Sequence, residues 1–407
     1  MSRATGLAAG GLGARLLGTS VAFGVAAGAT WLAGRALAGR ISRDEAANPR
    51  LLNWEWARQL AVGIAQLGED SAWEAQGNQE SIRRVYEEHV ARSIELVSAY
   101  TGITLPSSRA QVYVFDRADW VDANLAQFQV MFAPLDAGYA STLARVRSAV
   151  TVGAMGQAML SGQMGVLLGY LGKRVLGQYD LSLLGREPVT EGRLYFVEPN
   201  IAALERRYRL PGDELRSWIA LHEVTHAFEF EAHPWVREYM NRLLTDYLRS
   251  LSEDLFGNRP GGALATYAGR IKSNLYQRGH MLELMMSPEQ REAFRQLQAL
   301  MALMEGYSNH VMQEVGLQHL KDHETLKRTF ESRARNRSPG ERLFIRLTGL
   351  DIKLEQYALG ERFCQEVVQA RGISFLNRVW EGPERLPTLE EIHEPQRWVA
   401  RQQAVVV

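Results

Sequence analysis

Residues 221–235 read LHEVTHAFEFEAHPW and contain the pattern His-Glu-x-x-His at His222, Glu223 and His226. On a helix, two histidines four residues apart project from one face, one turn above the other. Two neutral imidazoles in that arrangement can bind one zinc ion. Glu223, beside the first histidine, is placed to take a proton from water at such a site. The alternative is a helix whose two histidines are satisfied by other partners.

The neighbouring sequence predicts that both histidines lie on the buried face of one helix. Asp213 and Glu214 suit a helix N-terminus, where acidic side chains meet the positive end of the dipole, and Pro234 is expected to end the helix. An apolar stripe with spacings of three and four runs through both histidines: Leu215, Trp218, Ile219, His222, His226 and Phe230. A buried imidazole needs a polar partner, which is either a metal ion or a backbone carbonyl.

A third protein ligand is expected, because zinc in a hydrolase usually has three protein ligands and one open position. The metzincin pattern would place glycine at position 229 and histidine at 232, where this chain has Glu229 and Ala232. His233 lies about 10 Å along the helix from His226, too far to share an ion with it. Glu229 is expected to be an outer group that contacts a ligand rather than the metal.

The candidate third ligand is Glu305, in a second predicted helix. Residues 287–290 (SPEQ) combine an N-cap, a proline in the first turn and a capping box. The apolar face that follows, up to Gly316, carries Glu305 as its lone carboxylate. Burying a carboxylate is costly without a cation, so a metal ion or a buried Arg or Lys is expected beside it. Asn309, four residues later, lies on nearly the same side and is a candidate outer group that orients a ligand histidine.

This order of elements is that of a gluzincin-type site, and much of the chain resembles the bacterial zincin-like metallopeptidase family. One branch of that family is named for its genomic association with the biosynthesis of a deazaflavin coenzyme. The resembling stretches run in family order from about residue 52 to the C-terminus: 114–124 (VFDRADWVDAN), 175–180 (VLGQYD), 194–208 (LYFVEPNIAALERRY), 218–235 (WIALHEVTHAFEFEAHPW), 286–294 (MSPEQREAF), 302–312 (ALMEGYSNHVM) and 375–392 (FLNRVWEGPERLPTLEEI).

The resemblance implies a mainly helical fold with a small β-sheet (α+β), zincin-like, with one zinc ion per chain. It implies His222, His226 and Glu305 as zinc ligands and Glu223 as the catalytic base. Sites of this kind usually lie beneath a sheet whose edge strand holds an extended substrate, an expectation by analogy. Where the family often has Glu-Gly-His-Ala-Asp, residues 305–309 here read Glu-Gly-Tyr-Ser-Asn, so position 309 can accept a hydrogen bond but carries no charge.

The expected reaction is zinc-dependent hydrolysis, foremost of a peptide bond in a peptide or protein substrate. Glu223 would accept a proton from water and return it to the leaving amine. The developing oxyanion needs a further donor, and the sequence offers four candidates: Tyr307, His310, Tyr276 and His280. The helical angles of Tyr307 and His310 point away from the ligand face.

The sequence leaves two other functions open. One is a non-catalytic zincin that acts as a binding or scaffold module, tethered to a membrane in one version, and Asn309 would agree with it. Glu223 argues against it, because a structural metal site has no need of a base. The other is a hydrolase of a non-peptide amide in coenzyme metabolism, which rests on the name of the family branch alone.

Composition excludes some classes of function. The 46 Lys and Arg residues balance 46 Asp and Glu residues, so the formal net charge is zero and no basic field would attract nucleic acid. The single cysteine, Cys364, excludes an internal disulfide and a Cys-rich zinc site. A chain without disulfides is compatible with the cytoplasm and does not exclude export.

Residues 1–50 are expected to form an Ala/Gly-rich leader. Within it, residues 16–34 carry no charge and are just long enough to cross a bilayer. A membrane anchor, a cleaved export signal and a soluble helix or leader are all compatible with this composition. Localisation therefore stays open between the cytoplasm and membrane association through residues 16–34.

Residues 51–407 are expected to form one zincin-like domain. Its predicted parts are an N-terminal helical part with strands (51–210), the metal-site helices (211–332) and a C-terminal helical segment (343–407), with 333–342 as a linker. The clearest strands are 111–116 and 194–197, and residues 79–100 are predicted to be helical. The uncharged run 149–172 contains many glycines, which favours tightly packed helices inside the core over a membrane span.

Overall fold

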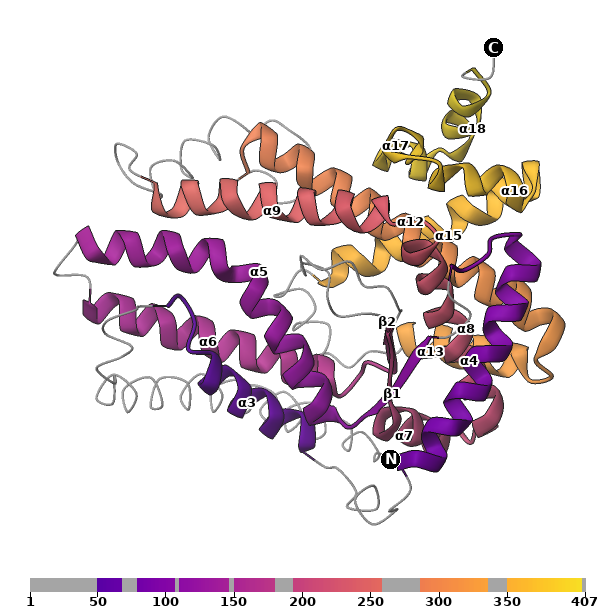
Figure 1. Ribbon diagram of the computed structural model, residues 1–407, viewed down its shortest axis with the longest axis horizontal. Helices are drawn as coiled ribbons and strands as arrows, with labels where there is room; N and C mark the ends of the chain where they lie inside the picture. Colours follow the sequence, from indigo (N-terminus) through magenta and orange to yellow (C-terminus); the bar gives the residue numbers. More distant parts are fainter. Residues whose placement is uncertain are drawn as a thin grey trace, which may run out of the picture.

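The computed structural model describes residues 50–67, 79–106, 110–145, 150–179, 193–257, 286–335 and 350–404. Helices dominate these residues, and one small sheet lies among them, which confirms the predicted α+β class (Figure 1). The helices before the HExxH segment are α3 (Trp54–Gln66), α4 (Gln79–Thr101), α5 (Arg117–Arg145), α6 (Val150–Gly172) and α7 (Glu198–Tyr208). The later helices are α8 (Gly212–Glu231), α9 (Trp235–Phe256), α12 (Pro288–His319), α13 (His323–Arg335), α15 (Leu350–Arg371), α16 (Ile373–Leu376), α17 (Leu389–His393) and α18 (Pro395–Ala404).

The sheet has three strands in the order β1 (Gln111–Phe115), β3 (Arg193–Val197) and β2 (Gly177–Tyr179). Strand β1 runs parallel to β3, whereas β2 is antiparallel to it and forms one edge of the sheet. The two longer strands fall where the β-branched and aromatic runs predicted them. Strand β2 was not predicted, because three residues are too few to show an alternating pattern.

Two apolar clusters fill the interior. The larger one joins the inward faces of α4, α8, α12 and α15 to one face of the sheet, including Val112, Leu194 and Phe196. The smaller one joins α3, α5 and α6 around Trp54 and Trp120 and includes Val197 of β3. The sheet therefore lies between the two clusters, and the HExxH helix belongs to the larger.

Helix α8 forms within the limits that its sequence predicts. Asp213 and Glu214 lie in its first turn, and it ends at Glu231, before Pro234 opens α9. A buried ion-pair network fixes the beginning of α8 against α7 and α4. The guanidinium of Arg216 pairs with Glu198 and Glu205, and the hydroxyl of Tyr86 donates to the other oxygen of the Glu198 carboxylate. Burial raises the pKa of Tyr86, so its hydroxyl stays a donor.

Helix α12 begins as predicted, with a capping box between Ser287 and Gln290. The apolar face was expected to run up to Gly316, and the helix continues past that residue to His319. A Cβ at Gly316 would lie 3.2 Å from the ring of Trp218, so glycine serves close packing at this position. The backbones of α12 and α15 are in direct contact one turn before Glu305. A Cβ at Gly360 would lie 1.8 Å from the carbonyl oxygen of Ala302.

Residues 150–172 of the uncharged run form a single helix, α6, rather than several buried helices. Its glycines pack on α3, where a Cβ at Gly165 or Gly169 would lie 2.8 Å from the carbonyl oxygen of Ala57 or Ala61. Its other side reaches the surface, where Met159 is 56% exposed. In the ranges that the structure describes, no helix is both long and apolar enough to cross a bilayer. Residues 1–49, Tyr276, His280 and most of the predicted linker 333–342 lie outside the described residues.

Candidate metal centre

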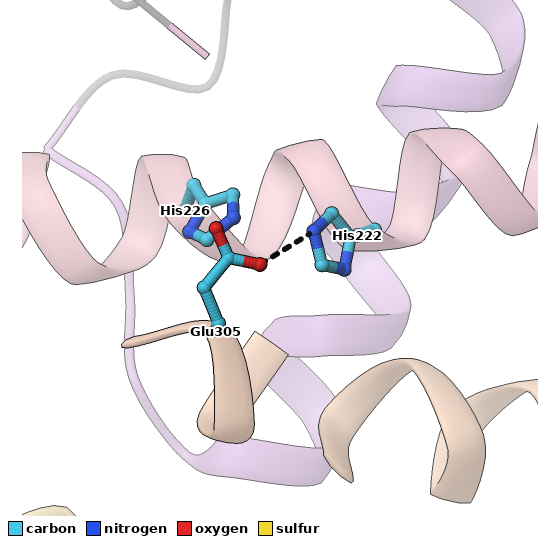
Figure 2. A group of neighbouring side chains, drawn as sticks. All are labelled: His222, His226 and Glu305. Atoms are coloured by element: carbon cyan, nitrogen blue, oxygen red, sulfur yellow. Dashed lines mark ion pairs between the residues drawn. The ribbon is translucent and has the colours of Figure 1, made fainter. Parts of the chain in front are cut away.

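Three side chains converge between α8 and α12: His222, His226 and Glu305 (Figure 2). One ligand atom from each lies within 4.8 Å of the others, and Nε2 of His222 is 3.7 Å from Oε2 of Glu305. A tetrahedral zinc ion with bonds of about 2.0–2.1 Å would separate its ligand atoms by roughly 3.3 Å, so small side-chain rotations would bring the three atoms to a shared ion. Within the described ranges, no other trio of His, Cys, Asp or Glu side chains has a geometry that could hold a metal.

Glu229 and Ser308 fix the ring of His226 from behind. Nδ1 of His226 is 2.7 Å from Oε2 of Glu229 and 3.1 Å from Oγ of Ser308, whose hydroxyl donates to Oε1 of the same glutamate at 3.1 Å. With Nδ1 engaged, Nε2 is the nitrogen that remains for a metal ion. A carboxylate behind a ligand histidine sets its tautomer and raises its basicity.

The surroundings of the two histidines shift their pKa values in opposite directions. Burial and the neighbouring His226 lower the pKa of His222 to about 3, so its ring is neutral and can act as a ligand. Burial alone would lower the pKa of His226, but the carboxylates of Glu229, Glu305 and Glu223 together outweigh burial and raise that pKa. Two imidazoles and one carboxylate form a donor set typical of catalytic zinc, and they leave a fourth position open.

Glu223 lies beside these ligands and is 6% exposed. Burial raises its pKa to about 7, against the lowering effect of the charge on His226 and of a backbone hydrogen bond from Tyr179. A carboxyl group whose pKa lies near 7 can both accept and donate a proton at neutral pH. The carboxyl group also lies against the edge strand, since a Cβ at Gly177 would be 2.7 Å from its Oε1.

The other residues that the sequence singled out are spread over different places. Glu229 contacts His226, whereas the side chain of Asn309 makes no hydrogen bond with any described residue. Ser308 makes the contact with His226 that was expected of Asn309. Tyr307 is fully buried and donates to Oδ1 of Asn377 at 2.8 Å. Glu229 and Ser308 therefore contact His226, whereas the hydroxyl of Tyr307 is bonded to a different residue.

The side chain of His310 is engaged with α4. Its Nε2 lies 2.9 Å from the hydroxyl of Tyr100, and the residue is 2% exposed. Tyr307 and His310 thus contact Asn377 and Tyr100, and an oxyanion-stabilising role for either stays a prediction. Tyr276 and His280 belong to the part of the chain that the structure does not describe.

Sequence reasoning missed three contacts at the site: Ser308 behind His226, and Gly177 and Tyr179 beside Glu223. Ser308 lies three residues after Glu305 on the same inward face, and that spacing was the available signal. Gly177 and Tyr179 belong to the short strand β2, whose sequence carries no signal strong enough to place it over α8.

Comparisons with known proteins agree with this geometry. Residues 52–399 match the family model described as zincin-like metallopeptidase. The chain is also similar to a protein from Chloroflexus aurantiacus whose crystal structure is described as that of a "putative hydrolase with a novel fold". The two chains are 38% identical, with a TM-score of 0.62 over 86% of this chain and 99% of the other. A search of curated proteins gave no match.

Proposed function

This chain belongs to the zincin-like metallopeptidase family, and from that premise we propose that it is a zinc-dependent hydrolase that cleaves peptide bonds. The observation that carries the proposal is the convergence of His222, His226 and Glu305 beside the buried carboxyl group of Glu223. A purely structural metal site would have no use for a general base next to the ion. The similarity to the protein from Chloroflexus aurantiacus that is described as a "putative hydrolase" supports the same reaction class.

In the proposed mechanism, Nε2 of His226, a ring nitrogen of His222 and the carboxylate of Glu305 hold one zinc ion. When bound, the ion supplies Lewis acidity, which polarises a carbonyl group and acidifies water. Glu223 accepts the proton of the attacking water and later gives it to the leaving amine. Glu229 and Ser308 keep the His226 ring in the tautomer that presents Nε2.

Metal removal tests the proposed function. The zinc-loaded full-length protein, incubated with a mixed peptide library, is expected to produce new peptide termini that mass spectrometry detects. A zinc chelator should stop the cleavage, and added zinc should restore it, because the reaction requires the ion. Zinc-loaded protein that cleaves no peptide in the library would contradict the peptidase assignment.

Glu229→Gln is expected to weaken zinc binding by about 10–100-fold, the usual effect of removing a partner of a ligand histidine. The amide keeps the shape of the side chain, but it removes the negative charge that raises the basicity of His226. Titration with a competing chelator measures the affinity. Ser308→Ala, which leaves the carboxylate in place, should have a smaller effect, and the reverse ranking would contradict the role of Glu229.

A further inference from the structure

Strand β2 lies directly on the carboxyl group of Glu223. A Cβ at Gly177 would be 2.7 Å from both Cγ and Oε1 of Glu223 and 2.9 Å from its Cδ. Non-bonded carbon atoms are stable at about 3.5–4 Å, so these distances are well inside contact range. Any side chain at position 177 would therefore displace the carboxyl group of Glu223.

The backbone of β2 presents N–H groups on the side away from β3. Val197 of β3 donates its N–H to the carbonyl oxygen of Leu176 at 2.8 Å. Because hydrogen-bonded and non-hydrogen-bonded pairs alternate in antiparallel strands, the N–H groups of Gly177 and Tyr179 point away from β3. A backbone hydrogen bond from Tyr179 acts to lower the pKa of Glu223, against the larger raising effect of burial.

Strand β2 is held in place from several sides. Gly177 lies opposite Phe196, whose ring stacks on Tyr86 with centroids 4.2 Å apart. The amide oxygen of Gln178 accepts a hydrogen bond from Nε1 of Trp120 at 2.7 Å. The ring of Tyr179 stacks on Phe230 of α8 with centroids 5.5 Å apart. A clash at position 177 would therefore be relieved by moving Glu223 rather than the strand.

We propose that strand β2 positions the general base, because Gly177 leaves the space that the carboxyl group of Glu223 occupies. This inference rests on the proposed function and adds Gly177, which carries no ionisable side chain, as a positioning residue.

A double-mutant cycle on thermal stability tests the contact without metal or substrate. Gly177→Ala alone is expected to lower Tm, by about 2 °C or more in a chain of this size. In a Glu223→Ala background the same change should have no effect, because Cγ, Cδ and Oε1 of residue 223 are gone. Gly63→Ala is the matched control, since a Cβ there meets nothing within 4 Å. Equal Tm changes in both backgrounds would overturn the contact.

Activity tests the positioning role. Zinc-loaded Gly177→Ala is expected to keep stoichiometric zinc and a KM within about twofold, while kcat falls about a hundredfold, the scale for a base displaced by an ångström. Gly63→Ala should keep full kcat. An unchanged kcat in Gly177→Ala would overturn the positioning role. A parent protein that binds zinc but hydrolyses nothing would instead defeat the proposed function, and the stability cycle would still report on the contact.

Discussion

Glu305→Ala is expected to abolish stoichiometric zinc binding by the full-length protein. The substitution leaves His222 and His226 as the only protein ligands, whereas a zinc site in a hydrolase usually has three. Affinity should fall by more than about a hundredfold, beyond the 10–100-fold typical of an outer partner. The Glu305 carboxylate lies 3.7 Å from Nε2 of His222, so its removal acts directly on the ligand set.

Elemental analysis after dialysis, together with chelator competition, measures the effect of Glu305→Ala. Glu292→Ala is the matched control, because Glu292 is an exposed carboxylate on the same helix, α12, and should leave zinc binding unchanged. Circular dichroism checks that both variants keep their helices. Unimpaired zinc binding in Glu305→Ala would eliminate Glu305 as the third ligand.

Glu223→Gln is expected to remove hydrolysis while zinc stays bound. Glutamine has nearly the same shape and can still accept the hydrogen bond from Tyr179, but it cannot take a proton from water. General acid–base catalysis contributes about 10²–10⁴-fold, so kcat should fall by that factor. Stopped or continuous assays with a cleaved library peptide give kcat, and elemental analysis gives the zinc content.

The hydrolysis rate and the zinc content of Glu223→Gln together distinguish a role of residue 223 in proton transfer from a role in metal binding. Glu292→Gln should retain full activity, which controls for the loss of one carboxylate anywhere on the chain. If Glu223→Gln hydrolysed peptides as fast as its parent, another group would have to serve as the base. Loss of zinc in Glu223→Gln would show that residue 223 acts on the metal ligands rather than on the proton.

The helices that carry the site could be predicted because local signals define them. Pro234 after α8 and the capping box from Ser287 in α12 act within one or two turns of their own positions. The inward position of Glu305 also follows from helical periodicity alone. These features need no knowledge of what packs against the helix.

Prediction from the sequence failed where packing between distant elements decides which residues come into contact. Glycine is common where helices end, but Gly316 lies inside α12, where it leaves room for the ring of Trp218 on α8. Ser308 and Asn309 are adjacent on α12, and only the position of α8 decides which one meets His226. Strand β2 is too short to carry a pattern, so its place against Glu223 could not be foreseen.

Anomalous diffraction tests most directly whether one zinc ion binds between α8 and α12. Crystals of the zinc-loaded protein, measured on both sides of the zinc absorption edge, are expected to show one strong peak per chain. That peak should lie about 2 Å from a ring nitrogen of His222, from Nε2 of His226 and from a carboxylate oxygen of Glu305. A peak bound by other residues, or no peak between these three side chains, would contradict the account.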